Sequence, residues 1–140
     1  MATPAHQLWS FGGFSSSREG HGSNELLTLD LTALHSTGVT PGFTGWATTT
    51  GFTLDPSPRW FHTANVVAGS MIVFGGDTAA GPVQDMWAMD MVTSQWRVVT
   101  PDVPPPRYAH SASVWGSLLV VFGGRDDIEV LNDMWVFNTV

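Results

Sequence analysis

A stretch of this sequence recurs after 48 residues without a gap. When residues 58–90 are aligned with residues 106–138, 12 of the 33 positions are identical. The identities include Pro-Arg-x-x-His, Phe-Gly-Gly and Asp-Met-Trp, each at the same offset. A fixed period near this length indicates one supersecondary unit stacked on copies of itself. Because such a unit cannot bury its apolar face alone, we expect the copies to pack side by side.

Each copy contains a short apolar run that a glycine pair ends. In the first clean copy the run is Met71–Phe74 and the pair is Gly75-Gly76. Short runs rich in β-favouring residues are typical of buried strands, and paired glycines allow positive φ where the chain turns sharply. Farther along, the two-residue period of a strand places Asp85, Trp87 and Met89 on one face. The sequence therefore predicts an all-β fold of short strands.

The apolar run, the double glycine and the later spaced aromatic residues resemble the kelch repeat, one four-stranded blade of a β-propeller. A third, looser copy comes earlier, with Gly12-Gly13 and a closing Trp46. The resemblance implies a kelch-type β-propeller fragment of four-stranded antiparallel blades, with about ten strands in all. Blade A is expected over residues 5–52, blade B over residues 58–100, and blade C over residues 106–140 without its outer strand.

The number of blades expected, about two and a half, is below the usual range for a propeller of about four to eight. The sequence stops at Val140, where the outer strand of blade C should begin. An exposed strand edge invites pairing with another chain. We therefore expect a fragment of a longer kelch protein. The alternative is that copies of the chain associate through their open blade edges to complete a ring.

Residues that recur at the same register are expected to have structural roles. The tryptophans should pack blade against blade, and Arg59 and Arg107 should hold a loop to a strand through hydrogen bonds. The alternatives are sugar stacking by the tryptophans and ligand contact by the two arginines. His62 and His110 are expected to cap or pack the start of the inner strands. The alternative for these histidines is a metal site, which would need them close together with converging carboxylates. The structural repeat residues are Gly12, Gly13, Gly75, Gly76, Gly123, Gly124, Trp46, Trp87, Trp96, Trp135, Arg59, Arg107, His62 and His110.

The loops are where the copies differ from one another. In kelch propellers the loops that join strands 2–3 and 4–1 share one face, and that face commonly grips partner peptides. Here the 2–3 loops are expected at residues 14–23, 77–83 and 125–131, and they vary in length and charge. Function on a rigid scaffold concentrates in such loops. The candidate partner-binding residues are Arg18, Glu19, His21, Asp77, Arg125, Asp126 and Asp127.

Composition narrows the classes of partner. The net charge of −7, with five Arg and no Lys, argues against a nucleic-acid or anionic membrane surface. The absence of Cys excludes disulfides and thiolate metal sites, and it favours a reducing compartment. The sequence shows no signal peptide and no apolar stretch long enough to span a bilayer. We therefore expect a cytoplasmic protein that binds a protein partner and no cofactor.

No catalytic constellation stands out in the sequence. Copper oxidases resembling galactose oxidase need a Tyr–Cys cross-link and a further Tyr, whereas this chain has no Cys and only Tyr108. The Glu, Asp and His cluster of iron-dependent specifier proteins is also absent at its four-residue spacing. The sequence therefore predicts a non-enzymatic interaction module or scaffold. Two alternatives stay open: a piece of a galactose-oxidase-type propeller enzyme with its catalytic residues in missing blades, or a truncated product without a function of its own.

Overall fold

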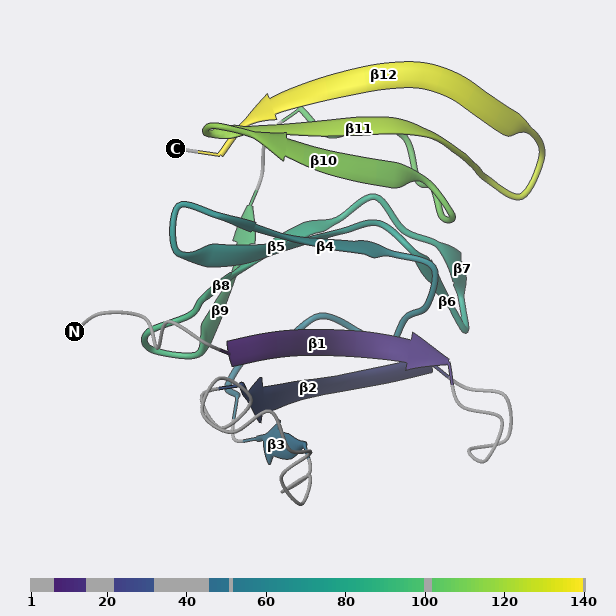
Figure 1. Ribbon diagram of the computed structural model, residues 1–140. Helices are drawn as coiled ribbons and strands as arrows, with labels where there is room; N and C mark the ends of the chain where they lie inside the picture. The colour runs from purple at the N-terminus through teal and green to yellow at the C-terminus, as the bar shows by residue number, and fades with distance from the viewer. Residues whose placement is uncertain (1–6, 15–21, 32–45, 51, 100–101, 140) are drawn as a thin grey trace, which may run out of the picture.

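The computed structural model describes residues 7–14, 22–31, 46–50, 52–99 and 102–139. Within these ranges the chain forms three antiparallel sheets, stacked face to face in chain order, and one short two-stranded hairpin (Figure 1). This arrangement confirms the predicted all-β fold of kelch type. The three sheets are called sheet 1, sheet 2 and sheet 3 from the N-terminal end.

Sheet 1 has the strand order β1-β2-β3. It is built from β1 (Gln7–Phe14), β2 (Gly22–Asp30) and β3 (Ala47–Thr49). The register of β1 and β2 shifts between Phe11 and Gly13, where the first glycine pair lies. Glycine relieves the strain of this irregularity, because Gly12 and Gly13 have φ values of 68° and 107°.

Sheet 2 has four strands in the order β4-β5-β8-β9. They are β4 (Thr63–Val67), β5 (Ser70–Phe74), β8 (Met86–Asp90) and β9 (Gln95–Val99). Strand β5 coincides with the strand predicted at residues 70–74, which contains the apolar run Met71–Phe74. Strand β5 lies between two neighbours, and four of its five residues are buried, as a continuous apolar run predicts.

Sheet 3 has the order β10-β11-β12. Its strands are β10 (Ser111–Trp115), β11 (Leu118–Arg125) and β12 (Val130–Asn138). Arg125, Val130 and Leu131, at the two ends of the predicted loop 125–131, pair in this sheet, so that the connection between β11 and β12 is residues 126–129. The pairing of β11 and β12 spans the glycine corner with a shift between Phe122 and Gly124.

Two features of sheet 2 and sheet 3 differ from the sequence expectation. The predicted loop 77–83 contains the hairpin of β6 (Asp77–Thr78) and β7 (Gly81–Pro82). The Thr78 hydroxyl closes this hairpin by donating to the Gly81 carbonyl oxygen at 2.8 Å. The sequence predicts the inner strands near residues 61–67 and 109–115, but β4 and β10 each begin two residues later, because the φ values of 55° and 53° at Phe61 and Ala109 interrupt the extended backbone.

Two apolar clusters join the sheets. One lies between sheet 1 and sheet 2 and includes Phe11, Leu26 and Trp87. The other lies between sheet 2 and sheet 3 and includes Phe74, Leu119 and Phe137. Face-to-face packing of this kind holds the sheets together by removing apolar surface from water. The stacking fixes which ends of the strands, and which loops, lie side by side.

Candidate functional site

One end of the sheet stack gathers the irregular connections. The β6–β7 hairpin and the ends of β1 and β11 project there, at the right of Figure 1, whereas the β4–β5, β8–β9 and β10–β11 turns lie at the left. We call the first end the loop face. The glycine corners Gly12-Gly13, Gly75-Gly76 and Gly123-Gly124 lie just before the connections of this face.

Buried arginines hold the loop face to the sheets. Arg59 is fully buried and donates to Asp85 Oδ1 at 2.6 Å, to Asp85 Oδ2 at 2.9 Å and to the Gly75 carbonyl oxygen at 3.0 Å. Arg107 makes the equivalent bonds to Asp133 and Gly123. A bidentate arginine–carboxylate pair combines charge with fixed geometry. Each arginine therefore fastens the segment before an inner strand to the third strand of the same sheet.

The carboxylates of these pairs stay charged well into acid. Hydrogen bonds from Arg107 hold the pKa of Asp133 well below its usual range. Burial acts to raise the pKa of Asp85, but the hydrogen bonds from Arg59 and Trp87 outweigh it and lower the pKa. The Trp87 indole N–H donates to Asp85 Oδ2 at 2.7 Å. The aspartate thus links the arginine to a tryptophan in the sheet junction.

The two recurring histidines lie at the junctions between sheets. The His62 Nε2–H donates to the Phe11 carbonyl oxygen of sheet 1 at 3.0 Å, and His110 Nε2 shares a 2.9 Å hydrogen bond with the Thr63 hydroxyl of sheet 2. Burial, with a smaller effect of the neighbouring arginine, lowers the pKa of each histidine to about 4. Over the described ranges, no group of three or more His, Asp or Glu side chains is placed to hold a metal ion.

Aromatic side chains form contacts along the loop face from sheet to sheet. Phe14, at the end of β1, meets the edge of Trp60 at a centroid distance of 5.8 Å. The exposed Phe61 stacks on Tyr108 at 6.2 Å, and the guanidinium of Arg125 lies 5.6 Å from the Tyr108 ring centroid. Solvent-exposed aromatic groups on a rigid frame are typical of protein-binding surfaces.

Two shallow grooves lie on the loop face at repeat-related positions. The first has a volume of about 310 Å³ and is lined by Gly22, Ser57, Pro58, Thr78, Ala79 and Ala80. The second has a volume of about 240 Å³ and is lined by Pro82, Pro106, Asp126, Asp127 and Ile128. The 48-residue offset maps Pro58 to Pro106 and residues 78–80 to residues 126–128. The same groove therefore recurs with a neutral lining and with an acidic one.

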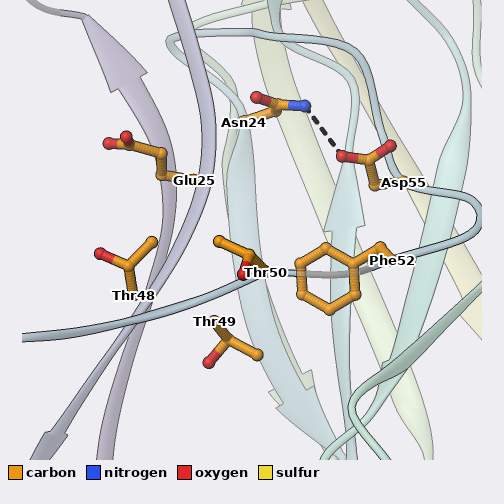
Figure 2. Close-up of a pocket in the computed structure, with 7 residues that line it drawn as sticks. All are labelled: Asn24, Glu25, Thr48, Thr49, Thr50, Phe52 and Asp55. Atoms are coloured by element: carbon orange, nitrogen blue, oxygen red, sulfur yellow. Dashed lines mark hydrogen bonds between the residues drawn. The ribbon is translucent and has the colours of Figure 1, made fainter.

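A third hollow of about 230 Å³ lies between β2, β3 and the segment before Arg59 (Figure 2). Its lining residues are Asn24, Glu25, Thr48, Thr49, Thr50, Phe52 and Asp55. The Asn24 amide donates to Asp55 Oδ2 at 2.8 Å, which ties β2 to the connection that leads into sheet 2. Polar side chains thus form most of the lining of this hollow, and Phe52 is the one large apolar side chain among the lining residues.

The predicted partner-binding residues divide into four groups. Arg125 exchanges two backbone hydrogen bonds with Tyr108 and places its guanidinium over the Tyr108 ring. Arg18, Glu19 and His21 lie outside the described residues. Asp77 contributes backbone bonds to Trp60 within the loop face. Asp126 and Asp127 line the second groove, where the Asp126 carboxylate accepts the backbone N–H groups of Ile128 and Glu129 at 2.7 and 2.8 Å. These two bonds are the main cause of the lowered pKa of Asp126.

Some residues of the loop face were not among the sequence candidates. Phe61 and Ile128 are 60% and 89% exposed; Phe61 occupies a variable position of the Pro-Arg-x-x-His segment, and Ile128 lies at a loop tip. The 48-residue offset could have predicted the two grooves, because it relates Pro58 to Pro106 and the loop tip 78–80 to the loop tip 126–128. Among the predicted structural residues, Trp96 is buried between sheets, whereas Trp46 is 42% exposed.

Comparison with known proteins places the chain in a family. A model described as the KLHDC2/KLHL20/DRC7 Kelch-repeats domain matches residues 1–140. The chain is 45% identical over 49 residues to multiple epidermal growth factor-like domains protein 8 of Mus musculus, which covers 33% of this chain and 2% of that protein. It is 36% identical over 58 residues to tip elongation aberrant protein 3 of Schizosaccharomyces pombe, covering 40% of this chain and 5% of that protein. The chain therefore belongs to the kelch-repeat family.

Membership of the family carries a general function. Kelch-repeat domains are protein-interaction modules as a rule, and this family is generally non-enzymatic. The aligned segments span only 2–5% of the length of these curated relatives. No helix within the described ranges is long and apolar enough to cross a membrane.

Proposed function

We propose that this chain is a protein-interaction module that docks a partner on its loop face. The observation that carries the proposal is the groove that recurs beside Pro58 and beside Pro106. The frame around it is constant from repeat to repeat, while the lining changes from Ala79 to Asp127 and from Ala80 to Ile128. A constant frame with variable tips is the arrangement expected of a recognition surface.

The exposed groups around the second groove define what it can contact. Ile128 offers a large apolar side chain to solvent, and Pro82 and Pro106 supply apolar walls. Asp127 contributes a carboxylate that has no hydrogen-bond or ion-pair partner among the described residues. A partner that covers the groove would bury the apolar side chains of Ile128 and the two prolines, and it could place complementary charge against the Asp127 carboxylate.

Hydrogen bonds order the loop tips in the absence of a partner, and this order favours binding. Asp126 holds the 126–129 turn through two backbone hydrogen bonds, and Thr78 holds the β6–β7 hairpin through its hydroxyl. A surface that is already ordered loses less conformational entropy when a partner binds. The shallow form of the grooves suits a peptide or protein surface rather than a fully enclosed small molecule.

A selection from a phage-displayed random peptide library tests the proposal. We expect peptides that bind the chain to lose at least about tenfold in affinity when Ile128→Arg or Asp127→Arg is introduced, because both side chains line the groove. The matched control is Val92→Arg, an equally drastic change at an exposed residue in the turn that joins β8 and β9 at the opposite end.

Retention of binding in both loop-face variants, or equal loss in Val92→Arg, would remove the loop face as the site. Circular dichroism of each variant must match the parent chain, so that loss of binding reports the surface and not unfolding. Asp126 is left unchanged in these tests because its carboxylate holds the turn.

A further inference from the structure

Two aromatic residues occupy the same position in successive repeats but have neighbours of opposite charge. The 48-residue offset maps Trp60 to Tyr108, and it maps Asp77, beside the first ring, to Arg125, beside the second. Trp60 and Asp77 exchange backbone hydrogen bonds of 2.8 and 3.0 Å, and Tyr108 and Arg125 exchange bonds of 2.9 and 3.0 Å. Residues directly opposite each other in an antiparallel pair direct their side chains to the same side. The ring and the charged group are therefore neighbours in both repeats.

The second of these pairs is a cation–π contact within the chain. The guanidinium carbon of Arg125 lies 5.6 Å from the centroid of the Tyr108 ring. The face of an aromatic ring is electron-rich and attracts a cation at this distance. The backbone arrangement of the repeat thus leaves room for a guanidinium group over the ring.

The first pair has a ring of the same placement without the cation. Tryptophan attracts cations more strongly than tyrosine does. Asp77 stands where the second pair has an arginine, and its Oδ1 accepts the Thr78 backbone N–H at 3.0 Å. The other carboxylate oxygen has no hydrogen-bond or ion-pair partner among the described residues. The Trp60 ring and the Asp77 carboxylate, which we call the Trp60–Asp77 pair, are both complementary to a positive charge.

Packing holds the Trp60 ring in place before any ligand binds. A Cβ at Gly22 would lie 2.6 Å from Trp60 Cε3, so the ring packs directly on this glycine. The ring of Phe14 contacts Trp60 at a centroid distance of 5.8 Å and an interplanar angle of 71°. Trp60 is nevertheless partly exposed. An ordered and accessible ring loses little conformational entropy when a ligand covers it.

The described arginines of the chain are engaged elsewhere. Arg59 and Arg107 are fully buried in ion pairs within their own sheets. Arg125 lies over Tyr108. Arg97 is on β9, which forms the opposite edge of sheet 2 from β4, the strand that follows Trp60. A cation for the Trp60–Asp77 pair is therefore expected from a partner.

We propose that the Trp60–Asp77 pair is a binding subsite for an arginine side chain of the partner. The guanidinium group would lie on the indole face, as that of Arg125 lies over Tyr108, and its N–H groups would donate to the Asp77 carboxylate. A planar guanidinium can stack and donate at once, whereas a lysine ammonium group is a point charge without a stacking plane. This subsite rests on the function proposed above, since it lies on the loop face, and it specifies the chemistry of the partner.

The first groove adjoins this subsite. Its lining includes Gly22, on which Trp60 packs, and Thr78, which follows Asp77 in the chain. No charged side chain is among the lining residues of this groove. A peptide whose arginine covers Trp60 would place the flanking residues in or beside the groove, so we expect those residues to be small and uncharged.

An NMR titration of the full chain with the peptide acetyl-Ala-Arg-Ala-amide tests the subsite. We expect the indole Nε1–H resonance of Trp60 to shift and to saturate at about millimolar peptide. The matched peptide carries citrulline, which keeps the shape of arginine without its charge, and it should bind at least about fivefold more weakly. Equal affinities of the two peptides, or no shift at Trp60, would overturn the proposal.

The variant Asp77→Asn removes the charge but keeps an oxygen for the Thr78 N–H. We expect it to weaken binding of the arginine peptide by about two- to fivefold. The matched control is Asp90→Asn, because the Asp90 carboxylate also accepts backbone N–H groups, at 2.8 Å, in the turn at the opposite end. Equal weakening in the two variants would assign the effect to net charge and contradict the subsite.

The variant Arg125→Asp reproduces the first pair at the position of the second. It removes the internal cation from Tyr108 and leaves a carboxylate beside the ring. We expect the ring resonances of Tyr108 to shift with the arginine peptide in this variant, less in Arg125→Gln, and not in the parent chain. Because Arg125 is exposed, the fold should be kept even if changes at the Trp60–Asp77 pair unfold the chain. A folded Arg125→Asp variant with no response at Tyr108 would contradict the proposal.

These results separate the arginine subsite from the broader docking surface. Selected peptides that depend on Asp127 and Ile128, combined with no response of Trp60 to the arginine peptide, would keep the loop face as the docking surface and overturn the subsite. A Trp60 response that distinguishes arginine from citrulline would support the subsite even if selection from the peptide library failed.

Discussion

Arg107 and Asp133 form two hydrogen bonds of 2.6 and 2.9 Å across 26 residues of sequence. Arg59 and Asp85 form the same two bonds at the same distances one repeat earlier. In each pair the guanidinium is fully buried and the carboxylate is partly exposed. The repeat unit is therefore defined by a charged contact inside each sheet as well as by apolar packing between sheets.

Arg107→Met should lower the free energy of unfolding by about 3 kcal/mol, because it leaves a carboxylate and a carbonyl oxygen without their buried donor. Urea denaturation measures the change. The control is Arg125→Met at an exposed arginine, where we expect a change within about 0.5 kcal/mol. Equal effects of the two substitutions would show that burial of Arg107 contributes nothing to stability.

Trp87→Ala should lower the free energy of unfolding by about 3–5 kcal/mol. Trp87 is buried in the cluster between sheet 1 and sheet 2 and also donates to Asp85. Removing the indole leaves a cavity in this cluster and takes one hydrogen bond away from the Asp85 carboxylate. Trp115→Ala, at a 77% exposed tryptophan, is the matched control and should change little. A loss under about 1 kcal/mol for Trp87→Ala would remove it from the core.

Gly75→Ala should destabilise the chain far more than Gly116→Ala, although both glycines have a φ of 61°. The backbone strain of alanine is therefore the same at the two positions. At Gly75 the new Cβ would also lie 2.6 Å from the Arg107 carbonyl oxygen, whereas at Gly116 it meets nothing within 4 Å. We expect a difference of at least about 2 kcal/mol in urea denaturation. Equal decreases in the free energy of unfolding would mean that the Arg107 backbone can move away from a Cβ at Gly75 at no cost in stability.

The free energy of unfolding should fall as the pH drops from about 6.5 to about 4. His62 and His110 have pKa values lowered to about 4 in the folded chain, against 6.5 without burial. Between these values the unfolded chain binds more protons, so acid favours unfolding. Each histidine can contribute at most about 3 kcal/mol.

Urea denaturation at a series of pH values measures this slope. The double variant His62→Gln, His110→Gln serves as the comparison, and the readout is its slope rather than its absolute stability. We expect the slope between pH 4 and 6.5 to be nearly flat in the double variant. A slope as steep as that of the parent chain would place the titrating groups elsewhere.

The local structure of the repeats could be predicted from the order of the residues alone. The apolar run 71–74 became the buried part of a strand, and the glycine pairs became corners with positive φ, because both properties depend on residues close together in the chain. The kelch resemblance rested on the same spacing. The β6–β7 hairpin was missed since its strands have two residues each, too few to show a period, and the hydrogen bonds of the Thr78 hydroxyl are not visible in the sequence pattern.

The contacts of each repeated residue depend on the packing of the sheets. Phe74 and Phe122 have the same neighbours in sequence, Val before them and Gly-Gly after, yet one is buried and the other is half exposed. The grooves beside Pro58 and Pro106 likewise form between loops of different repeats. A repeat pattern specifies a strand and its faces, but burial depends on whether another sheet lies against that face, and this is a property of the assembled stack.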